Sequence, residues 1–143
     1  MPICRELRPL YPPHWKELSR QVRFVRAGGA CERCGRPPGA LIRCLPEGRW
    51  FDGGQRTWRD RRGRSAPSPD LVALIPARTT RVVLATAHLE HDPTNNRLRN
   101  LTSLCQRCHM IHDRPHHLAQ RRITYRSRYP AGDLFLGLYG RHL

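Results

Sequence analysis

Side chains that bind metals or transfer protons are concentrated in one stretch of the chain, residues 87–113. They are His88, His91, Asn100, Cys105, Cys108, His109, His112 and Asp113. Thiolates and imidazoles are common metal ligands, and imidazole also exchanges protons near neutral pH. A hydrophobic core does not require so many of these groups close together. We therefore interpret this stretch as the chemical site of the protein.

Two cysteine pairs share one spacing. Cys31 and Cys34 are followed by Gly35, and Cys105 and Cys108 repeat the same interval. The glycine allows a tight turn that points backbone amides at sulfur, as in a zinc knuckle. Four thiolates saturate a tetrahedral ion, so we predict one structural Zn²⁺ that takes no part in catalysis.

Two alternatives to the shared zinc remain. In the first, one cysteine pair binds zinc together with His109 or His112, and the other pair stays free. In the second, the pairs are redox thiols, which have the same spacing. A redox pair is expected at the start of a helix, whereas residues 31–34 follow a predicted helix and precede Pro37 and Pro38. The sequence therefore favours zinc.

A second metal ion is expected on the helix that follows Cys108. His109, His112 and Asp113 are three and four residues apart, which places their side chains on one helical face. Nitrogen and carboxylate ligands together can bind a divalent ion, to which His91 could also contribute. Mg²⁺ or Mn²⁺ suits phosphate chemistry, while a histidine-rich site could prefer Zn²⁺ or Ni²⁺.

His88 is the candidate general base. It comes at the end of a predicted strand, and the unperturbed pKa of imidazole lies near neutrality, so it could take a proton from water. The metal ion would hold the scissile phosphate and stabilise charge on the leaving oxygen. Asn100 is expected to bond to the loop backbone and orient His88.

This set of residues resembles the HNH endonuclease family, also called His-Me finger or ββα-metal nucleases. The residues that carry the resemblance are His88, Asn100-Leu101, Leu104-Cys105-x-x-Cys108-His109 and the upstream Cys31-x-x-Cys34-Gly35. Together with the upstream helix they cover roughly half of the chain. The resemblance implies that His88 is the general base, Asn100 the middle asparagine, and His109 a metal ligand on the finger helix. It also implies hydrolysis of DNA to 5′-phosphate and 3′-hydroxyl ends.

Ala87 departs from the family pattern. The family usually has Asp or His immediately before the general base, as a first metal ligand, and alanine cannot coordinate. Either His91 or Asp92 replaces that ligand, or His112 or Asp113 does, or the protein is a catalytically impaired DNA-binding protein. Because His91, His112 and Asp113 would otherwise be an unexplained surplus of candidate ligands, we favour replacement of the missing ligand by one of them.

The charge of the chain indicates a polyanionic partner. Its 143 residues carry a net charge of +15, with 26 Lys plus Arg against 11 Asp plus Glu. Two groups of arginines are predicted to contact DNA phosphates. These are Arg59, Arg61, Arg62 and Arg64 in a loop, and Arg121, Arg122 and Arg126 on a helix. For the loop, an ordinary solvated surface is the alternative.

No apolar run is long enough for a membrane span, and the N-terminus lacks an apolar signal region. We therefore expect a cytoplasmic protein without a membrane partner, in which paired cysteines bind metal more often than they form disulfides.

These residues are expected to lie in a small single α+β domain, residues 1–143, with a ββα-metal finger, two zinc knuckles and flanking helices. Residues 1–13 form a proline-rich arm, and residues 14–35 a helix and the first knuckle. An apolar stripe of Trp15, Leu18, Val22 and Val25 marks that helix, and Gly28-Gly29 ends it.

A hairpin and loop insertion is expected over residues 40–80, with its turn at 46–48 and a loop at 65–70. The ββα core covers residues 81–114, with strands at 81–87 and 97–99 and a helix that Pro115 ends. Residues 115–143 contain a second helix at 117–128 and an apolar tail at 134–139. The tail is expected to cap the core, with a homodimer contact as the alternative.

Overall fold

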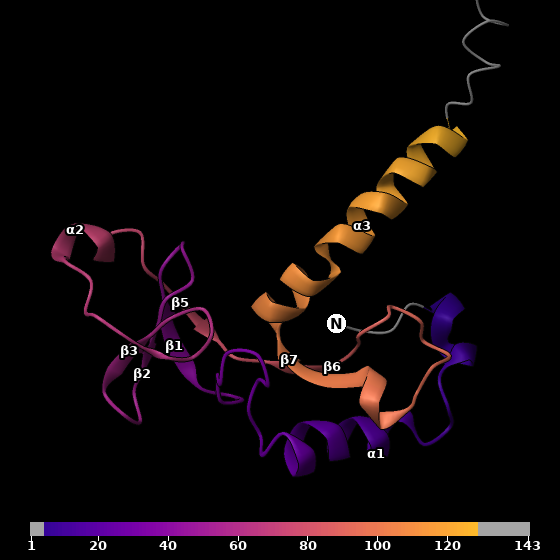
Figure 1. Cartoon of the computed structure of the whole chain (residues 1–143), viewed down its shortest axis with the longest axis horizontal. Coiled ribbons are helices and arrows are strands. Elements are labelled where there is room, and N and C mark those ends of the chain that lie inside the picture. The colour runs from indigo at the N-terminus through magenta and orange to yellow at the C-terminus, as the bar shows by residue number, and fades with distance from the viewer. Residues whose placement is uncertain (1–4, 129–143) are drawn as a thin grey trace, which may run out of the picture. The chain divides into compact units, whose positions relative to one another are not determined.

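The computed structural model describes residues 5–128, which combine helices with two antiparallel sheets (Figure 1). The predicted α+β class is confirmed. Residues 1–110 form one compact unit and residues 111–143 a second. Cys4, His142 and the tail at 134–139 lie outside the described residues, as do the side chains of residues 125–128.

The first unit begins with a short 3₁₀ helix, η1 (Arg5–Leu10), and a longer helical segment. This segment is α-helical over α1 (Trp15–Arg20) and π-helical over η2 (Gln21–Arg26). The wider π turn rotates the later side chains away from the α-helical stripe. Val22 is fully buried as predicted, but Val25 is 74% exposed, so its assignment to the packed stripe is wrong. Gly28 and Gly29, with φ of 58° and 71°, end the segment as predicted.

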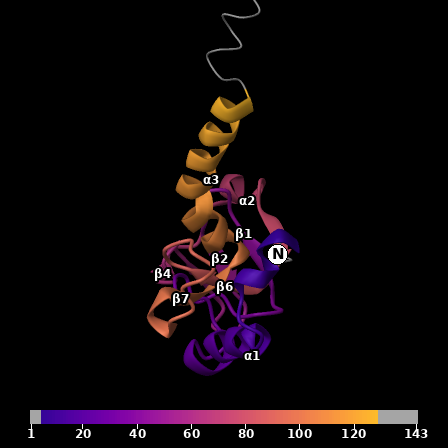
Figure 2. The same cartoon turned by 90° about the vertical axis from the view of Figure 1, so that its right-hand side faces the viewer.

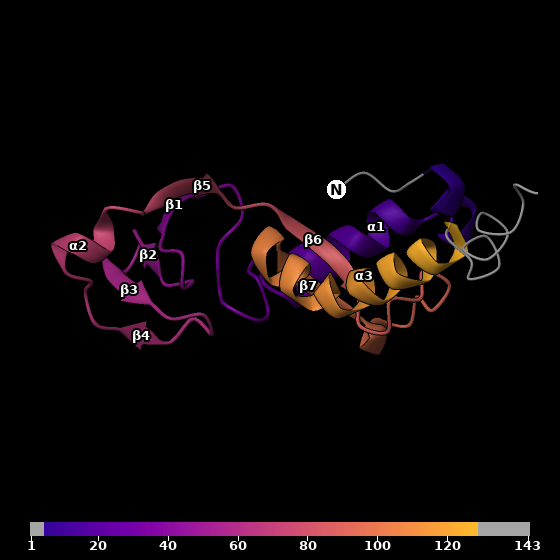
Figure 3. The ribbon, with the colours of Figure 1, turned by 90° about the horizontal axis from the view of Figure 1, so that it is seen from above.

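Residues 40–81 form a five-stranded antiparallel sheet with the order β4-β3-β2-β1-β5 (Figure 3). Its strands are β1 (Leu41–Cys44), β2 (Trp50–Asp52), β3 (Thr57–Arg59), β4 (Ser65–Ala66) and β5 (Arg78–Arg81). The predicted hairpin is confirmed, because Cys44 pairs with Trp50 across the turn. The loop predicted over 65–70 is wrong at its start, where β4 pairs with β3. A short helix, α2 (Leu71–Leu74), follows this strand.

Tryptophan burial explains why the arginine-rich segment begins with a strand, β3. Trp58 was predicted to lie among phosphate-binding arginines, but it is only 9% exposed. Its ring packs against Phe51, with the two ring centroids 5.5 Å apart. Trp50 on the neighbouring strand is 1% exposed. Burial of two large aromatic side chains stabilises the sheet despite the surrounding charge.

The candidate site lies on a strand–loop–strand–helix arrangement, as predicted. Strand β6 (Leu84–His88) pairs antiparallel with β7 (Leu101–Cys105), and α3 (Gln106–Arg128) follows. The helical segment η2 packs against both strands, and Figure 2 shows α1 on the same side of the hairpin. The second strand is not at 97–99 as predicted. Residues Leu98–Asn100 form a 3₁₀ helix, η3, and pairing starts at Leu101.

The strand predicted over residues 81–87 is divided between the two sheets. Val82 exchanges backbone hydrogen bonds with Gly39 and Ala40, which extends the pairing of β5. At Val83 the partner changes to Gln106, whose side chain accepts from the Val83 amide at 3.0 Å and donates to the Arg81 carbonyl at 2.7 Å. The chain therefore leaves the first sheet before β6 begins.

Pro115 does not end the helix, contrary to the prediction. Helix α3 continues from Gln106 to Arg128, so the second helix expected at 117–128 is part of it. Proline retains a helical φ and removes one backbone donor, at a cost of about 3 kcal/mol that a 23-residue helix can absorb. Within residues 5–128 no helix has the length and apolarity needed to cross a membrane.

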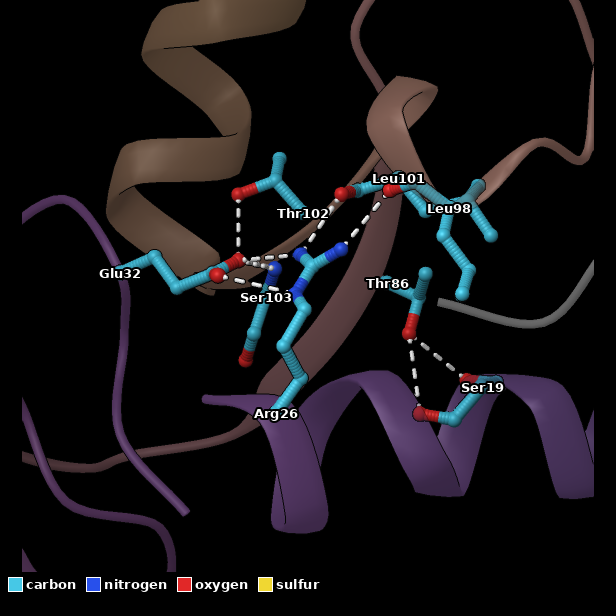
Figure 4. A network of polar contacts seen from close by, with 8 residues as sticks. All are labelled: Ser19, Arg26, Glu32, Thr86, Leu98, Leu101, Thr102 and Ser103. Carbon is cyan, nitrogen blue, oxygen red and sulfur yellow. Dashed lines mark hydrogen bonds and ion pairs between the residues drawn. The ribbon is translucent and has the colours of Figure 1, made fainter. Parts of the chain in front are cut away.

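A partly exposed ion pair joins the helical segment to the β6–β7 hairpin (Figure 4). Arg26 contacts the Glu32 carboxylate through two nitrogens, at 2.8 and 3.2 Å. Their further partners are the carbonyls of Leu98 and Leu101, the Thr102 hydroxyl and the Ser103 amide. Burial alone would raise the pKa of Glu32, but the hydrogen bonds outweigh it and lower that pKa.

We expect Glu32→Gln to lower the free energy of unfolding by about 2 kcal/mol, because several donors lose a charged acceptor in a partly exposed site. Since the folded-state pKa is lowered, the carboxylate stabilises the fold above its ordinary pKa of 4.5 and this contribution disappears as the pH falls. Urea unfolding of both proteins at neutral and acidic pH measures this difference. Glu47→Gln, which removes an exposed ion pair with Arg49, is the control and should change stability by less than about 0.5 kcal/mol. Equal effects of the two substitutions at neutral pH would contradict the assignment.

Candidate metal centre and histidine site

Four cysteines converge in the core of the first unit. Cys31 and Cys34 follow the helical segment, Cys105 ends β7, and Cys108 lies in the first turn of α3. All four are buried, and their sulfur atoms lie within 4.8 Å of one another. The predicted convergence of the two pairs is confirmed.

The sulfur geometry fits a metal ion. Cys34 Sγ and Cys105 Sγ are 3.7 Å apart. A tetrahedral ion with metal–sulfur bonds of about 2.3 Å requires about 3.8 Å between sulfurs, whereas a disulfide bond is about 2.05 Å long. The cluster could therefore hold a metal ion with all four positions filled by the chain.

Hydrogen bonds around the sulfurs favour the thiolate form of two of the four cysteines. Gly35 has φ of 73° and its amide donates to the Cys31 carbonyl at 2.7 Å, which closes the first knuckle. The backbone amides of Arg36 and Cys108 donate to the sulfurs of Cys34 and Cys105. Hydrogen bonding from Cys108 lowers the pKa of Cys105 to about 6. Bonding from Cys105 likewise lowers the pKa of Cys31, whereas bonding with Cys105 raises the pKa of Cys34 and of Cys108. Two of the thiols therefore ionise readily and donate no proton within the cluster, and the other two would lose their protons to a bound metal ion.

His88 is the last residue of β6, as predicted, but it is held in an aromatic cluster that the sequence did not indicate. It is 9% exposed and stacks on Trp15, with ring centroids 5.2 Å apart and planes at 10°. Tyr11 meets the imidazole edge-on at 5.7 Å, and burial raises the pKa of the Tyr11 hydroxyl. The arm and the first helix therefore fix the plane of the imidazole.

Asn96 determines which imidazole nitrogen carries the proton. His88 Nε2 is 3.0 Å from Asn96 Oδ1, and the Asn96 amide nitrogen donates to the carbonyls of Pro93 and Thr94. With its amide nitrogen committed in this way, Asn96 presents an acceptor oxygen, so Nε2 is the donor. The neutral imidazole then has its lone pair on Nδ1, the nitrogen that can accept a proton.

Asn100 binds the loop that follows His88, as predicted. Its side chain donates to the Asn95 carbonyl at 2.8 Å and accepts from the Glu90 amide at 3.1 Å. Its backbone carbonyl accepts from the Leu89 amide at 2.8 Å. Asn100 is 4% exposed, so these bonds are shielded from water. It orders the loop that carries Asn96 and thereby acts on His88 indirectly.

The residues predicted to hold a second ion are placed as follows. His109, His112 and Asp113 are partly exposed and keep their spacing on one continuous helix, α3. Asp113 also lies 3.9 Å from His117, one turn further along α3. His91 is in the loop after β6, with φ of 58°, and its amide donates to the His88 carbonyl at 3.2 Å. Their role as ligands stays a prediction.

Ala87 occupies a buried position. It is 2% exposed, pairs with Thr102 and belongs to the hydrophobic cluster around the four cysteines. A methyl group therefore packs where the family resemblance places a first metal ligand.

The predicted DNA-binding arginines differ in whether they already form ion pairs or hydrogen bonds within the protein. Arg59 binds Asp52 at 2.7 Å and donates to the Gly63 carbonyl, and this bonding lowers the pKa of Asp52. Arg64 pairs with Asp60 at 2.8 Å. Of the six that lie within residues 5–124, four are exposed and make no side-chain hydrogen bond or ion pair to another described residue. These are Arg61, Arg62, Arg121 and Arg122. The Arg126 side chain lies outside the described residues.

Three neighbours of His88 were missed from the sequence. Trp15 was assigned to helix packing, Tyr11 to the arm and Asn96 to a turn. Only the dense turn sequence at 92–96 gave a local signal, because Trp15 and Tyr11 are more than seventy positions away in the chain.

Comparisons with protein-family models, with curated proteins and with solved structures find no match.

Proposed function

We propose that this protein is a metal-dependent endonuclease that hydrolyses DNA phosphodiester bonds, in the manner of the HNH family that its motif resembles. The arrangement around His88 carries the proposal. An imidazole at the end of β6 stacks on Trp15 and has its Nε2 bonded to Asn96, on a loop ordered by Asn100. Such positioning is more than a structural histidine needs and is what a general base requires.

In this proposal His88 Nδ1 removes a proton from the attacking water, while Nε2–H remains bonded to Asn96 and stabilises the imidazolium that forms. The α3 residues His109, His112 and Asp113 would hold a divalent ion, Mg²⁺ or another. That ion supplies charge stabilisation at the leaving oxygen. Zn²⁺ in the four-cysteine cluster would have a structural role.

The net charge of +15 supports DNA as the partner. The exposed arginines Arg61, Arg62, Arg121 and Arg122 are the candidates for phosphate contact, whereas Arg59 is committed to Asp52. A cytoplasmic location belongs to the same proposal.

A second function is favoured by Ala87 and by the burial of His88. A catalytically impaired, zinc-stabilised DNA-binding protein needs neither a first metal ligand nor an accessible base. It predicts tight, salt-sensitive DNA binding without cleavage in any divalent ion.

A plasmid-nicking assay across Mg²⁺, Mn²⁺, Ni²⁺ and Zn²⁺ separates the two functions. We expect nicking by the parent protein with at least one ion, and its loss in His109→Ala, because a proposed ligand is removed. Met110→Ala, which alters the adjacent and 68% exposed residue of the same helix, is the control and should retain activity. Absence of nicking by the parent with every ion, alongside firm DNA binding, would favour the second function.

A further inference from the structure

We propose a phosphodiester-binding site at Gly48, formed by Arg61 and Arg107 with Arg36 behind them. It rests on the proposed function in that it assigns a contact for the DNA backbone. Only Arg61 among these residues belongs to the arginine groups expected from the sequence to contact DNA.

Side chains from three separate segments meet at Gly48, in the turn between β1 and β2. Gly48 is buried and has φ of 106°. A Cβ atom placed on it would lie 2.7 Å from both Arg107 Cζ and Arg61 Cγ. Arg36 donates to the Gly48 carbonyl at 3.3 Å. Glycine therefore leaves the space that these arginine side chains occupy.

The position of Arg61 is set by an ordered turn. The Asp60 carboxylate accepts from the amides of Arg62 and Arg64, at 2.7 and 2.9 Å. Gly63 has φ of 83°, and a Cβ atom on it would lie 2.7 Å from the Cys34 carbonyl oxygen. The turn thus packs directly on the first knuckle, which brings Arg61 to the same place as Arg107 of the second knuckle.

The charges at this place are poorly balanced. Among the described residues, Arg36, Arg61 and Arg107 take part in none of the ion pairs that the other arginines form. Glu47 is close enough to Arg107 for its pKa to respond, but its carboxylate binds Arg49 at 2.7 Å. The two nearby carboxylates, Glu47 and Asp60, are thus paired with Arg49 and Arg64.

Arg36 has a different role from the outer two arginines. It is 3% exposed, lies 5.7 Å from the centre of the Trp50 ring, and has an Nε with no hydrogen-bond partner. A four-thiolate site with a divalent ion carries a net charge of −2, and Arg36 follows Cys34 by two positions. Arg36 is buried between the Gly48 carbonyl and the Trp50 ring, so the exposed Arg61 and the half-exposed Arg107 are the two arginines that an external anion could reach.

A phosphodiester suits this pair. The planar guanidinium group binds two phosphate oxygens at once, and it is less strongly hydrated than an ammonium group. Arg61 lies on a turn that packs against the first knuckle, and Arg107 lies in the first turn of α3. Both backbones are therefore ordered before binding, which reduces the entropy cost of association.

The test is the salt dependence of binding to a fluorescent DNA duplex, measured in a His88→Ala background so that cleavage does not consume the probe. In Arg61→Gln with Arg107→Gln, the slope of log K against log salt should fall by about 1.8, or about 0.9 for each lost phosphate contact. The loss of affinity between about 50 and 200 mM salt should then be about twelvefold smaller than in the parent.

Arg43→Gln is the matched control. Arg43 is exposed on β1 and, by strand alternation, points away from the face of Cys44. Arg43→Gln removes one positive charge, as does each substitution of the double variant, and should leave the slope nearly unchanged. The site is wrong if the double variant keeps the parental slope of log K against log salt, or if Arg43→Gln lowers that slope as much as the double variant does. Failure of the nuclease proposal shows instead as absent plasmid nicking, whatever the slope.

Discussion

Cys105→Ser is expected to abolish metal binding and to unfold the first unit. Cys105 is fully buried, ends β7 and lies 3.7 Å from Cys34 across the cluster. Serine supplies no thiolate, so the ion loses one of four ligands. Structural zinc sites contribute about 10–16 kcal/mol of apparent binding free energy to small domains, far more than any single core contact. Metal analysis and far-UV circular dichroism of the purified protein measure both effects.

Cys44→Ser is the control for this prediction. Cys44 is half-buried on β1 beside the cluster, but it is not among the four converging sulfurs. This variant should retain one bound zinc per chain and a parental melting temperature within a few degrees. A Cys105→Ser protein with one tightly bound zinc and unchanged melting would refute a four-cysteine site.

His88→Gln is expected to lower DNA cleavage by about 10²- to 10⁴-fold while leaving DNA affinity intact. Glutamine is close in size to histidine and can still donate to Asn96 Oδ1, so the loop contact at 3.0 Å is preserved. It has no nitrogen that accepts a proton near neutral pH, so the general base is lost. Single-turnover cleavage and equilibrium binding on the same duplex separate these two effects.

His14→Ala controls for removal of a histidine as such. His14 is exposed one residue before α1 and should be dispensable for cleavage. If His88→Gln cleaves as fast as the parent, His88 is not the base, and the phosphate-hydrolysis mechanism proposed here is wrong.

Local sequence patterns predicted the features that depend on neighbouring residues. The Cys-x-x-Cys pairs, the helix end at Gly28 and the turn at 46–48 each follow from the backbone preferences of a few adjacent positions. Patterns failed where a distant partner intervened. Gln106, for example, divides the strand at Val83. Pro115 is a different case, because a long helix absorbs the cost of one proline and α3 continues through it.

The sequence by itself determined which groups can ligate a metal or move a proton, because ligand chemistry and spacing are properties of the residues. Only the tertiary structure decided the neighbours of those groups. In the folded protein Trp15 stacks on His88, and Asn96 forms a hydrogen bond with it. Arg59 forms an ion pair with Asp52, and the side chains of Arg61 and Arg107 lie against Gly48. These contacts join residues of different elements, some of them far apart in the chain, and their distances depend on how the sheets and knuckles pack.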